Sequence, residues 1–458
     1  MLTEKDASAT VNSPSTLPWY RGLTGYHWFV LVVCWMGWFF DTMDQQLFIL
    51  AREPAMKELL GQGASDATLM FYGGVATTVL MLGWATGGIV FGILGDRWGR
   101  AKTMLLTILV YSVFTGLSAL SVTWIDFSIY RFLTGMGVGG EFAAAVSMVA
   151  EIMPARSRPY ALGVLQAMGA IGNMTAACIS FLIPPGLQIH GVSGWRLMFL
   201  VGIIPSLLVV LVRRRLKEPE AWVRAKQAKP RGELQQKAQE LGSVRELFGD
   251  RRWRRNALVG IMLGLAGIMG LWGIGFWLPK LVRDVVKVDA DWYCSLAMLL
   301  FNGGAAVGTY LFAILMGRIG RKPAFALIFI VALATVFGVF GFMTKPSQVW
   351  WMAPVLGIGT LTIFGGYSIY FPELFPTRMR ATGVGFCYNT ARYLAATAPF
   401  TLGLLTTVYV GSGMTILSSL GSVDSPFRYA AFTVAGVFVL GLIVLPFAPE
   451  TKGKPLPE

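Results

Sequence analysis

Long apolar runs constrain this chain more than any other feature of its sequence. A transmembrane helix needs about 20 predominantly apolar residues, and the chain contains twelve runs near that length. The runs are continuous rather than alternating, which argues against a β-barrel. Charged residues make up 14% of the chain, against about 25% in soluble domains, which argues against a soluble protein. We therefore predict an all-α membrane protein with twelve transmembrane helices at about 27–50, 69–94, 103–123, 125–150, 160–184, 195–212, 256–279, 293–316, 323–343, 348–371, 380–410 and 427–447.

Most Lys and Arg residues lie in every second loop between the predicted spans. If the spans cross a membrane one after another, these loops all lie on the same side of it. The chain has 38 Lys and Arg residues against 24 Asp and Glu residues, a formal charge of +14. Loops rich in Lys and Arg stay on the cytoplasmic side. We therefore expect a multi-pass protein of the plasma membrane, the inner membrane of a bacterium, with both termini cytoplasmic. The charge excess is explained by this topology, so the expected partner is the lipid bilayer and no nucleic-acid partner is required.

A polar, basic stretch at 213–255 separates six spans from six. We expect an N-terminal tail (1–26), a first bundle (27–212), this linker, a second bundle (256–447) and a C-terminal tail (448–458). A local repeat supports the division: Gly95-Asp96-Arg97-Trp98-Gly99-Arg100 follows the second span, and Gly317-Arg318-Ile319-Gly320-Arg321-Lys322 follows the eighth. Repeated halves with a site at their interface are typical of secondary transporters.

Four motifs resemble those of the major facilitator superfamily, in its sugar-porter-like branch. They are Gly92-x-x-x-Asp96-Arg97-x-Gly99-Arg100, Arg131-x-x-x-Gly135-x-Gly137-x-Gly139-Gly140-Glu141, Pro372-Glu373-Leu374-Phe375-Pro376-Thr377-Arg378 and Pro449-Glu450-Thr451-Lys452-Gly453. In addition, Asp41-Thr42-Met43-Asp44 is similar to a motif of bacterial aromatic-acid and sialic-acid/monocarboxylate proton symporters. The resemblance implies two pseudo-symmetric six-helix bundles, the major facilitator fold, and proton-coupled transport of an organic acid.

Five charged residues lie inside the predicted spans: Asp41, Asp44, Arg131, Glu141 and Arg392. A charge at mid-bilayer costs about 3 kcal/mol on insertion scales, so these residues are the first candidates for function. Asp44 and Arg131 share one depth, and in the resembled family such a pair couples protons. The alternative is a static ion pair that holds two helices together. Asp41 is a second candidate on the same helix face, and Glu141 is either another proton site or a structural acceptor.

Arg392 has no acid in the neighbouring spans of its own half. An anionic substrate would supply the counter-ion, and in the resembled organic-anion carriers a basic residue here binds the substrate. The alternative is that Arg392 bonds to helix carbonyls or to Glu373. Further candidates for the substrate cavity, each more often a packing residue, are Gln45, Gln166, Asn173, Trp272, Asn302, Tyr367, Tyr370, Tyr388 and Asn389.

The repeated loop predicts a conformational gate at the cytoplasmic face. Asp96 would accept bonds at a helix N-terminus, and Arg97 and Arg100 would reach acids such as Glu151. A weaker equivalent in the second half would use Arg318, Arg321 and Glu373. The alternative is that these arginines serve topology alone.

The remaining chemistry of the sequence points away from an enzyme. The four cysteines lie singly in apolar runs, and two histidines are too few for a metal site, so we expect no metal and no cofactor. We expect a monomeric carrier that imports a small organic anion with protons by alternating access. Transport of a sugar or an organic cation, or a transporter-like nutrient sensor, remains as the alternative.

Overall fold

The computed structural model describes residues 18–61, 66–184, 187–189, 191–205, 215–227, 241–286, 290–396, 405–406, 408–409, 413–420 and 423–457. Several predicted segments lie partly outside these residues. They are the N-terminal tail, the end of the sixth span, the middle of the linker and the end of the eleventh span. Within the described part, the chain is nearly all helix, and nine helical segments are long and apolar enough to cross a membrane.

The first half of the chain forms the N-terminal helices and a short hairpin. Their bounds are α2 (Gly25–Leu60), α3 (Asp66–Trp98), α4 (Arg100–Ser118), α5 (Trp124–Ile152), α6 (Arg158–Leu182), β1 (Gln188–Ile189), β2 (Val192–Ser193) and α7 (Gly194–Val201). The two strands pair antiparallel, with Gln188 opposite Ser193. Two short helices of the linker follow: α9 (Glu220–Gln227) and α11 (Val244–Gly249).

The second half forms the C-terminal helices, several of which are interrupted. Their bounds are α12 (Arg251–Gly273), η1 (Gly275–Trp277), α13 (Leu278–Val285), α14 (Ala290–Ile319), α15 (Arg321–Phe342), η2 (Pro346–Gln348), α16 (Val349–Glu373), η3 (Thr377–Met379), α17 (Arg380–Ala395), α19 (Ile416–Ser419), α20 (Pro426–Ala435), α21 (Val437–Val444) and η4 (Leu445–Phe447).

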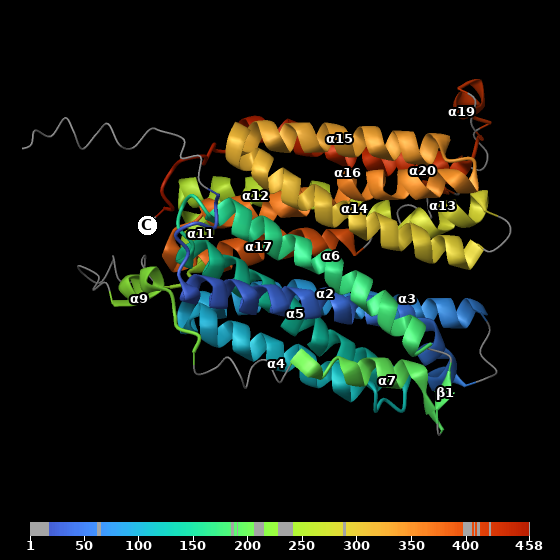
Figure 1. The fold of residues 1–458 in the computed structure, drawn as a ribbon, viewed down its shortest axis with the longest axis horizontal. Helices are drawn as coiled ribbons and strands as arrows, with labels where there is room; N and C mark the ends of the chain where they lie inside the picture. The colour runs from blue at the N-terminus through green and yellow to red at the C-terminus, as the bar shows by residue number, and fades with distance from the viewer. Residues whose placement is uncertain are drawn as a thin grey trace, which may run out of the picture.

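The long helices lie side by side along one direction (Figure 1). Within the N-terminal helices, α3 and α4 pack on α5, and α2 packs on α6; within the C-terminal helices, α14 and α15 pack on α16, and α12 packs on α17. The two sets meet where α6 packs on α14 and where α3 packs on α17. One end carries α9, α11 and the C-terminus, and we call it the linker end; the opposite end carries β1 and is called the hairpin end (Figure 1).

Local sequence explains where the helices begin. Thr24 and Thr123 start α2 and α5 with capping boxes, and Asp250 accepts from two backbone N–H groups of α12. Such caps satisfy amides that have no partner inside the helix. Gly99 and Gly320 precede α4 and α15 with φ of 125° and 101°, a region that side chains disfavour. The two copies of the repeated loop therefore make the same tight turn.

Hydropathy did not reveal the breaks in two spans. The expected span 256–279 stops being helical at Ile274 and continues as η1 and α13, and the span 427–447 divides into α20 and α21 at Gly436. The first span, expected at 27–50, is one helix from Gly25 to Leu60. Apolar residues are needed at these depths whether or not the helix is continuous, so composition does not report the interruption.

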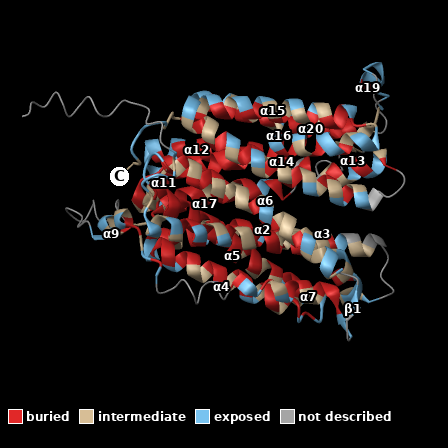
Figure 2. Ribbon diagram, in the orientation of Figure 1, coloured by how far each residue is buried: buried red, intermediate tan, exposed pale blue. Residues whose placement is uncertain are grey.

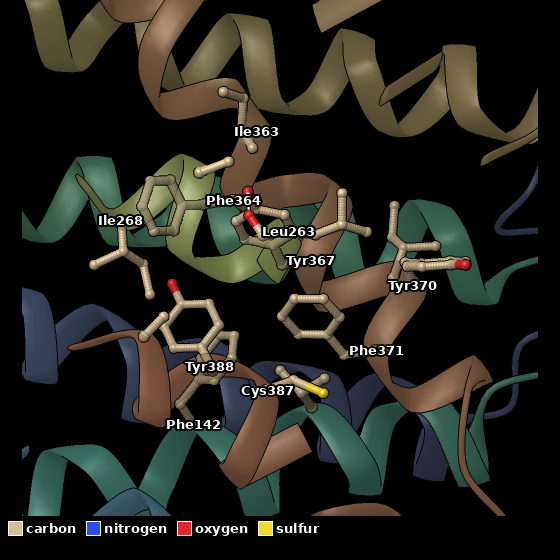
Figure 3. Packing of buried hydrophobic residues seen from close by; sticks show 14 of the residues in the cluster. Phe142, Leu263, Ile268, Ile363, Phe364, Tyr367, Tyr370, Phe371, Cys387 and Tyr388 are labelled. Atoms are coloured by element: carbon tan, nitrogen blue, oxygen red, sulfur yellow. Dashed lines mark hydrogen bonds between the residues drawn. The ribbon is translucent and has the colours of Figure 1, made fainter. Parts of the chain in front are cut away.

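Burial is greatest where the two sets of helices meet. Helices α5, α16 and α17 carry mostly buried residues, whereas α15 and α4 have an exposed outer stripe (Figure 2). Figure 3 shows part of this packing, in which aromatic rings of the second half lie near Phe142 of the first. In it, Tyr388 of α17 lies 4.4 Å from Phe142 of α5 and 6.0 Å from Phe364 of α16, between ring centroids.

Candidate functional site

A narrow cavity of about 90 Å³ lies between the N-terminal and the C-terminal helices. Its walls come from α2, α3 and α6 on one side and from α12, α14, α16 and α17 on the other. Seven of the residues predicted for the substrate line it: Gln45, Gln166, Asn173, Trp272, Asn302, Tyr388 and Arg392. The structure therefore brings together, at one cavity, side chains that lie almost 350 positions apart in the sequence.

Arg392 is held between two aromatic rings in the wall of this cavity. Its guanidinium carbon lies 3.8 Å from the ring centroid of Trp84 and 4.4 Å from that of Tyr388. Its Nη1 donates to Oδ1 of Asn389 at 2.6 Å. The Nε–H has no acceptor among the described residues, although the residue is 3% exposed. Burial between ring faces orients the guanidinium and leaves donor capacity unused.

Three residues predicted for the substrate lie outside the cavity in this structure. Asn389 is buried against Gly88 of α3, and its amide also donates to the carbonyl of Gly385. The hydroxyl of Tyr367 donates to the carbonyl of Leu263, and that of Tyr370 donates to the carbonyl of Pro449 at 2.7 Å. Asn389 thus orients Arg392, and the two tyrosines join neighbouring elements of the second half.

Amide side chains occupy another part of the cavity wall. Nδ2 of Asn173 donates to Oδ1 of Asn302 at 3.0 Å, which joins α6 to α14, and Asn302 donates in turn to the carbonyl of Met298 at 2.9 Å. Oε1 of Gln166 is buried with no donor among the described residues. The cavity therefore offers uncharged polar groups in addition to one guanidinium.

Two cavity tryptophans were not predicted for the site. Trp38 and Trp84 line the cavity, are about 5% exposed or less, and have indole N–H groups without an acceptor in the described part of the chain. Among the tryptophans, the sequence singled out Trp272, because most tryptophans of membrane proteins pack or lie at the membrane interface. The available signal was spacing, since Trp38 lies two helical turns before Gln45, which was predicted for the cavity.

Asp44 and Arg131 form an ion pair between α2 and α5. The distance from Nη1 of Arg131 to Oδ2 of Asp44 is 3.4 Å, and both side chains are buried. Thr115 donates to Oδ1 of Asp44 at 2.7 Å, and Nη2 of Arg131 donates to Ser118 at 2.7 Å. Close charge-assisted bonds are about 2.7–2.9 Å long, and the bonds to Thr115 and Ser118 lie in this range, whereas the contact between Asp44 and Arg131 is longer. Each charged residue is therefore held more tightly by a hydroxyl of α4 than by its ion-pair partner.

Asp41 and Glu141 form a second buried group next to this pair. The two carboxyl groups are close enough to interact electrostatically, and no N–H or O–H of the described residues donates to either. The Glu141 carboxyl lies over Gly37, where a Cβ would come 2.3 Å from Oε1. A glycine one turn before Asp41 therefore makes room for the carboxyl of α5.

The acidic residues lie behind the cavity wall rather than in it. Asp41 and Asp44 are on α2 beside Trp38 and Gln45, which line the cavity. Phe142, the residue after Glu141, lies 4.7 Å from Trp38 and 4.4 Å from Tyr388 between ring centroids. A layer of aromatic rings thus separates the carboxyl groups from the guanidinium of Arg392.

Three of the predicted gate residues, Asp96, Arg100 and Glu151, meet at the linker end and join the two sets of helices. The Asp96 carboxylate accepts from the amides of Ala381 and Thr382 at 3.2 and 2.7 Å, at the first turn of α17. Arg100 lies 2.8 Å from Asp96 and 3.1 Å from Glu151, and Glu151 lies 2.7 Å from Arg380 of the second half. These side chains are completely buried, so the linker end is closed.

The linker binds the first half at the same end. Glu218 accepts from the amides of Ala101 and Lys102 at 3.2 Å, and Trp222 donates to the carbonyl of Asp96 at 2.7 Å. Nε of Arg97 donates to the carbonyl of Leu241 at 3.3 Å. Arg97 therefore binds the linker and not an acid.

The equivalent network of the second half stays within that half. Arg321 lies 2.6 Å from Glu373, which also accepts from Thr451 of the C-terminal segment at 2.6 Å. The Arg318 side chain is exposed, and only its carbonyl enters this region, where it accepts from Lys452. Glu450 accepts from four backbone amides, two of them at the start of α15.

Comparison with known proteins identifies the family. The model of the Major Facilitator Superfamily matches residues 34–399, and the chain belongs to this superfamily of membrane transporters. It is 28% identical over 436 residues to a probable 4-methylmuconolactone transporter of Cupriavidus pinatubonensis, covering 95% of this chain and 93% of that protein.

Two further comparisons agree with this assignment. The chain is 26% identical over 383 residues to the cis,cis-muconate transport protein of Acinetobacter baylyi, covering 83% of this chain and 86% of that protein. Among solved structures, the proton:xylose symporter XylE superposes with a TM-score of 0.74 at 18% identity, covering 94% of this chain and 98% of XylE. The last likeness concerns the fold alone.

Proposed function

We propose that this transporter imports a small organic carboxylate together with protons by alternating access. Arg392 carries the proposal, because its guanidinium is buried in the cavity wall and no carboxylate of the described residues pairs with it. A buried charge without a partner is costly, and an anionic substrate removes that cost. A neutral sugar would leave the guanidinium unpaired, and a cation would be repelled by it.

The relatives support the cargo, and the charge distribution supports the orientation of the protein in the membrane. Two similar proteins are named as transporters of muconate and of a muconolactone. Exposed basic residues are frequent at the linker end, for example Arg318 and Arg251, so we assign this end to the cytoplasm by the rule for Lys and Arg. The working unit is a monomer of two six-helix bundles, with the division in the linker at 213–255.

Asp44 has a different role in the proposed proton step from the neighbouring carboxyls of Asp41 and Glu141. Asp44 is paired with Arg131, which supplies its counter-charge in this conformation. Asp41 and Glu141 have no cation or donor among the described residues, and two adjacent buried carboxyls cannot both be ionised. The pair therefore holds a proton while the linker end is closed, and releases it when the opening of that end admits water. If Arg131 withdraws during the cycle, Asp44 takes up a proton as well.

Uptake into proteoliposomes tests the substrate assignment. Labelled benzoate and hexanoate should enter vesicles of the wild type faster under an inward proton gradient. Arg392→Gln should lose this uptake, whereas Arg52→Gln should keep it, because Arg52 bonds to Thr77 away from the cavity. Full carboxylate uptake by Arg392→Gln would refute the assignment.

A second experiment separates coupling from binding. Asp41→Asn and Glu141→Gln should still exchange internal for external substrate but should no longer accumulate it against a gradient. Gln46→Glu is a suitable control for folding with an altered charge on α2, because Gln46 lies outside the cavity lining. Uphill accumulation by both the Asp41 and the Glu141 variants would show that the proton is carried elsewhere.

A further inference from the structure

The charges in the cavity wall restrict how many carboxylates the substrate can carry, which the proposed function leaves open. Among the described residues that line the cavity, Arg392 is the one cationic side chain, and no acid is present. The other walls are rings, small residues and amides. One fixed positive charge neutralises one carboxylate. A second carboxylate would be desolvated against uncharged groups, without the partner that a buried charge requires.

Unused donors and one unused acceptor indicate where the two ends of the substrate bind. Arg392 Nε, Trp38 Nε1 and Trp84 Nε1 are buried donors without an acceptor in the described chain. A carboxylate offers about four acceptor positions and matches this surplus. Trp38 Nε1 lies beside Gly169 of α6, where a Cβ would come within 2.6 Å, so the small residue leaves space next to this donor.

The part of the cavity wall that carries amide side chains has an unused acceptor instead of unused donors. Gln166 Oε1 is a buried acceptor without a donor among the described residues, and the Asn173–Asn302 bond lies in the same wall. A hydroxyl both donates and accepts, so it can bond to the Gln166 amide in either of the orientations that an amide side chain can take. A carboxylate at this position would meet an acceptor oxygen or one amide donor, with no cation.

We infer that the cavity selects monoanions with one carboxylate, bound by Arg392, and an uncharged hydroxyl, bound by Gln166, and that it discriminates against dicarboxylates. The inference rests on the proposed function, since it assigns Arg392 to the substrate carboxylate. It also separates this chain from its relative named as a cis,cis-muconate transport protein, because muconate carries two carboxylates.

Calorimetric titration of the full-length protein in lipid nanodiscs at pH 7 tests the inference. The aromatic probes are benzoate, 4-hydroxybenzoate and terephthalate; the aliphatic probes are hexanoate, 6-hydroxyhexanoate and adipate. Within at least one series, the hydroxy acid should bind about threefold to tenfold more tightly than the simple acid, as one added neutral hydrogen bond allows. The dicarboxylate should bind at least about 100-fold more weakly, as an unpaired buried charge requires.

Two variants of Gln166 make the test specific. Gln166→Leu should remove the advantage of the hydroxyl, so that the hydroxy acid binds no more tightly than the simple acid, whereas Gln46→Leu should keep this advantage. Gln166→Lys adds a second cation and should raise affinity for the dicarboxylate at least about tenfold, with a wild-type elution profile in size-exclusion chromatography as evidence of folding.

The outcomes distinguish this inference from the proposed function. If the wild type binds a dicarboxylate as tightly as the matching simple acid, the inference is overturned, while carboxylate recognition by Arg392 stands. The same holds if Gln166→Leu keeps the preference for the hydroxyl, or if Gln166→Lys elutes as the wild type does but gains nothing with dicarboxylates. If no carboxylate of either series binds, or if Arg392→Gln binds all of them normally, the proposed function fails and the inference fails with it.

Discussion

Asp96→Asn is expected to open the linker end. In the closed state, the Asp96 carboxylate accepts from two amides of α17 and pairs with Arg100 on its own side. Asparagine has nearly the same shape but no charge. Arg100 keeps Glu151 as a buried partner, so the substitution weakens the contact between the two sets of helices without leaving an arginine unpaired.

The size of the effect follows from the two amide bonds. A hydrogen bond to a charged group contributes about 1.5–3 kcal/mol and a neutral one about 0.5–1.5 kcal/mol. The two amides bind different oxygens of Asp96, and asparagine has only one acceptor oxygen. One bond therefore loses its charge, at about 1 kcal/mol, and the other is lost altogether, at about 2 kcal/mol, which makes about 3 kcal/mol of closure. Since 1.4 kcal/mol is a factor of ten in an equilibrium constant, the ratio of open to closed molecules should rise on the order of 100-fold.

Distances between two spin labels at the linker end would measure this ratio. Lys102 and Arg318 have exposed side chains on opposite sets of helices, so labels on Lys102→Cys and Arg318→Cys report separation, once the native cysteines are replaced. Asp126→Asn is the control, because Asp126 makes the same kinds of bond to residues 122–127 of its own half. If Asp96→Asn and the control both retain the wild-type distances, the assignment of closure to Asp96 is wrong.

Two further variants test packing and pH dependence. Gly139→Leu would bring a Cβ within 2.0 Å of the Trp84 carbonyl oxygen; because this contact joins backbones, we expect a loss of more than about 3 kcal/mol, seen as failure to yield monodisperse protein. At Glu450, burial raises the pKa, but four backbone N–H donors outweigh it, and the pKa lies below its ordinary 4.5. A carboxylate with a lowered pKa stabilises the fold above that range and loses the effect as acid protonates it. Glu450→Gln should therefore lower Tm at pH 7, with the difference from wild type shrinking below about pH 4; an equal difference at both pH values would contradict this.

Sequence predicted the charged pairs better than the uncharged part of the cavity. Asp44 and Arg131 are isolated charges in apolar helices at one depth, and such charges have few ways to be satisfied except by one another. Tyr367 gives no comparable signal, because a tyrosine in a buried helix packs equally well against a cavity or against another helix. Its hydroxyl bonds to α12 instead, a result that depends on how the helices rotate about their axes.

Comparison of the two copies of the repeated loop shows which contact closes the linker end, and the sequence motif alone does not show this. Gly99 and Gly320 make equivalent turns, and Glu218 and Glu450 accept from the first amides of α4 and α15. The copies differ where Gly317 stands in place of Asp96. The first copy therefore bonds across to α17, whereas the second has no carboxylate at the equivalent position.

This difference predicts the effect of Gly317→Asp. A Cβ at Gly317 would lie 3.4 Å from the Tyr160 hydroxyl, near the start of α6, so the new carboxylate can accept from the opposite half, as Asp96 does. One charge-assisted bond contributes about 1.5–3 kcal/mol, which should reduce the open population about tenfold to 100-fold and slow turnover.

The same spin-label distances and the uptake rate would test this second contact. Gly249→Asp adds an equal charge at the linker end, where no atom lies within 4 Å of the added Cβ, and should change neither quantity. An open population in Gly317→Asp equal to that of the wild type would mean that closure does not depend on the number of carboxylates between the halves. A transporter must release this contact in every cycle, so a single carboxylate at one copy of the loop keeps the closed state stable without trapping it.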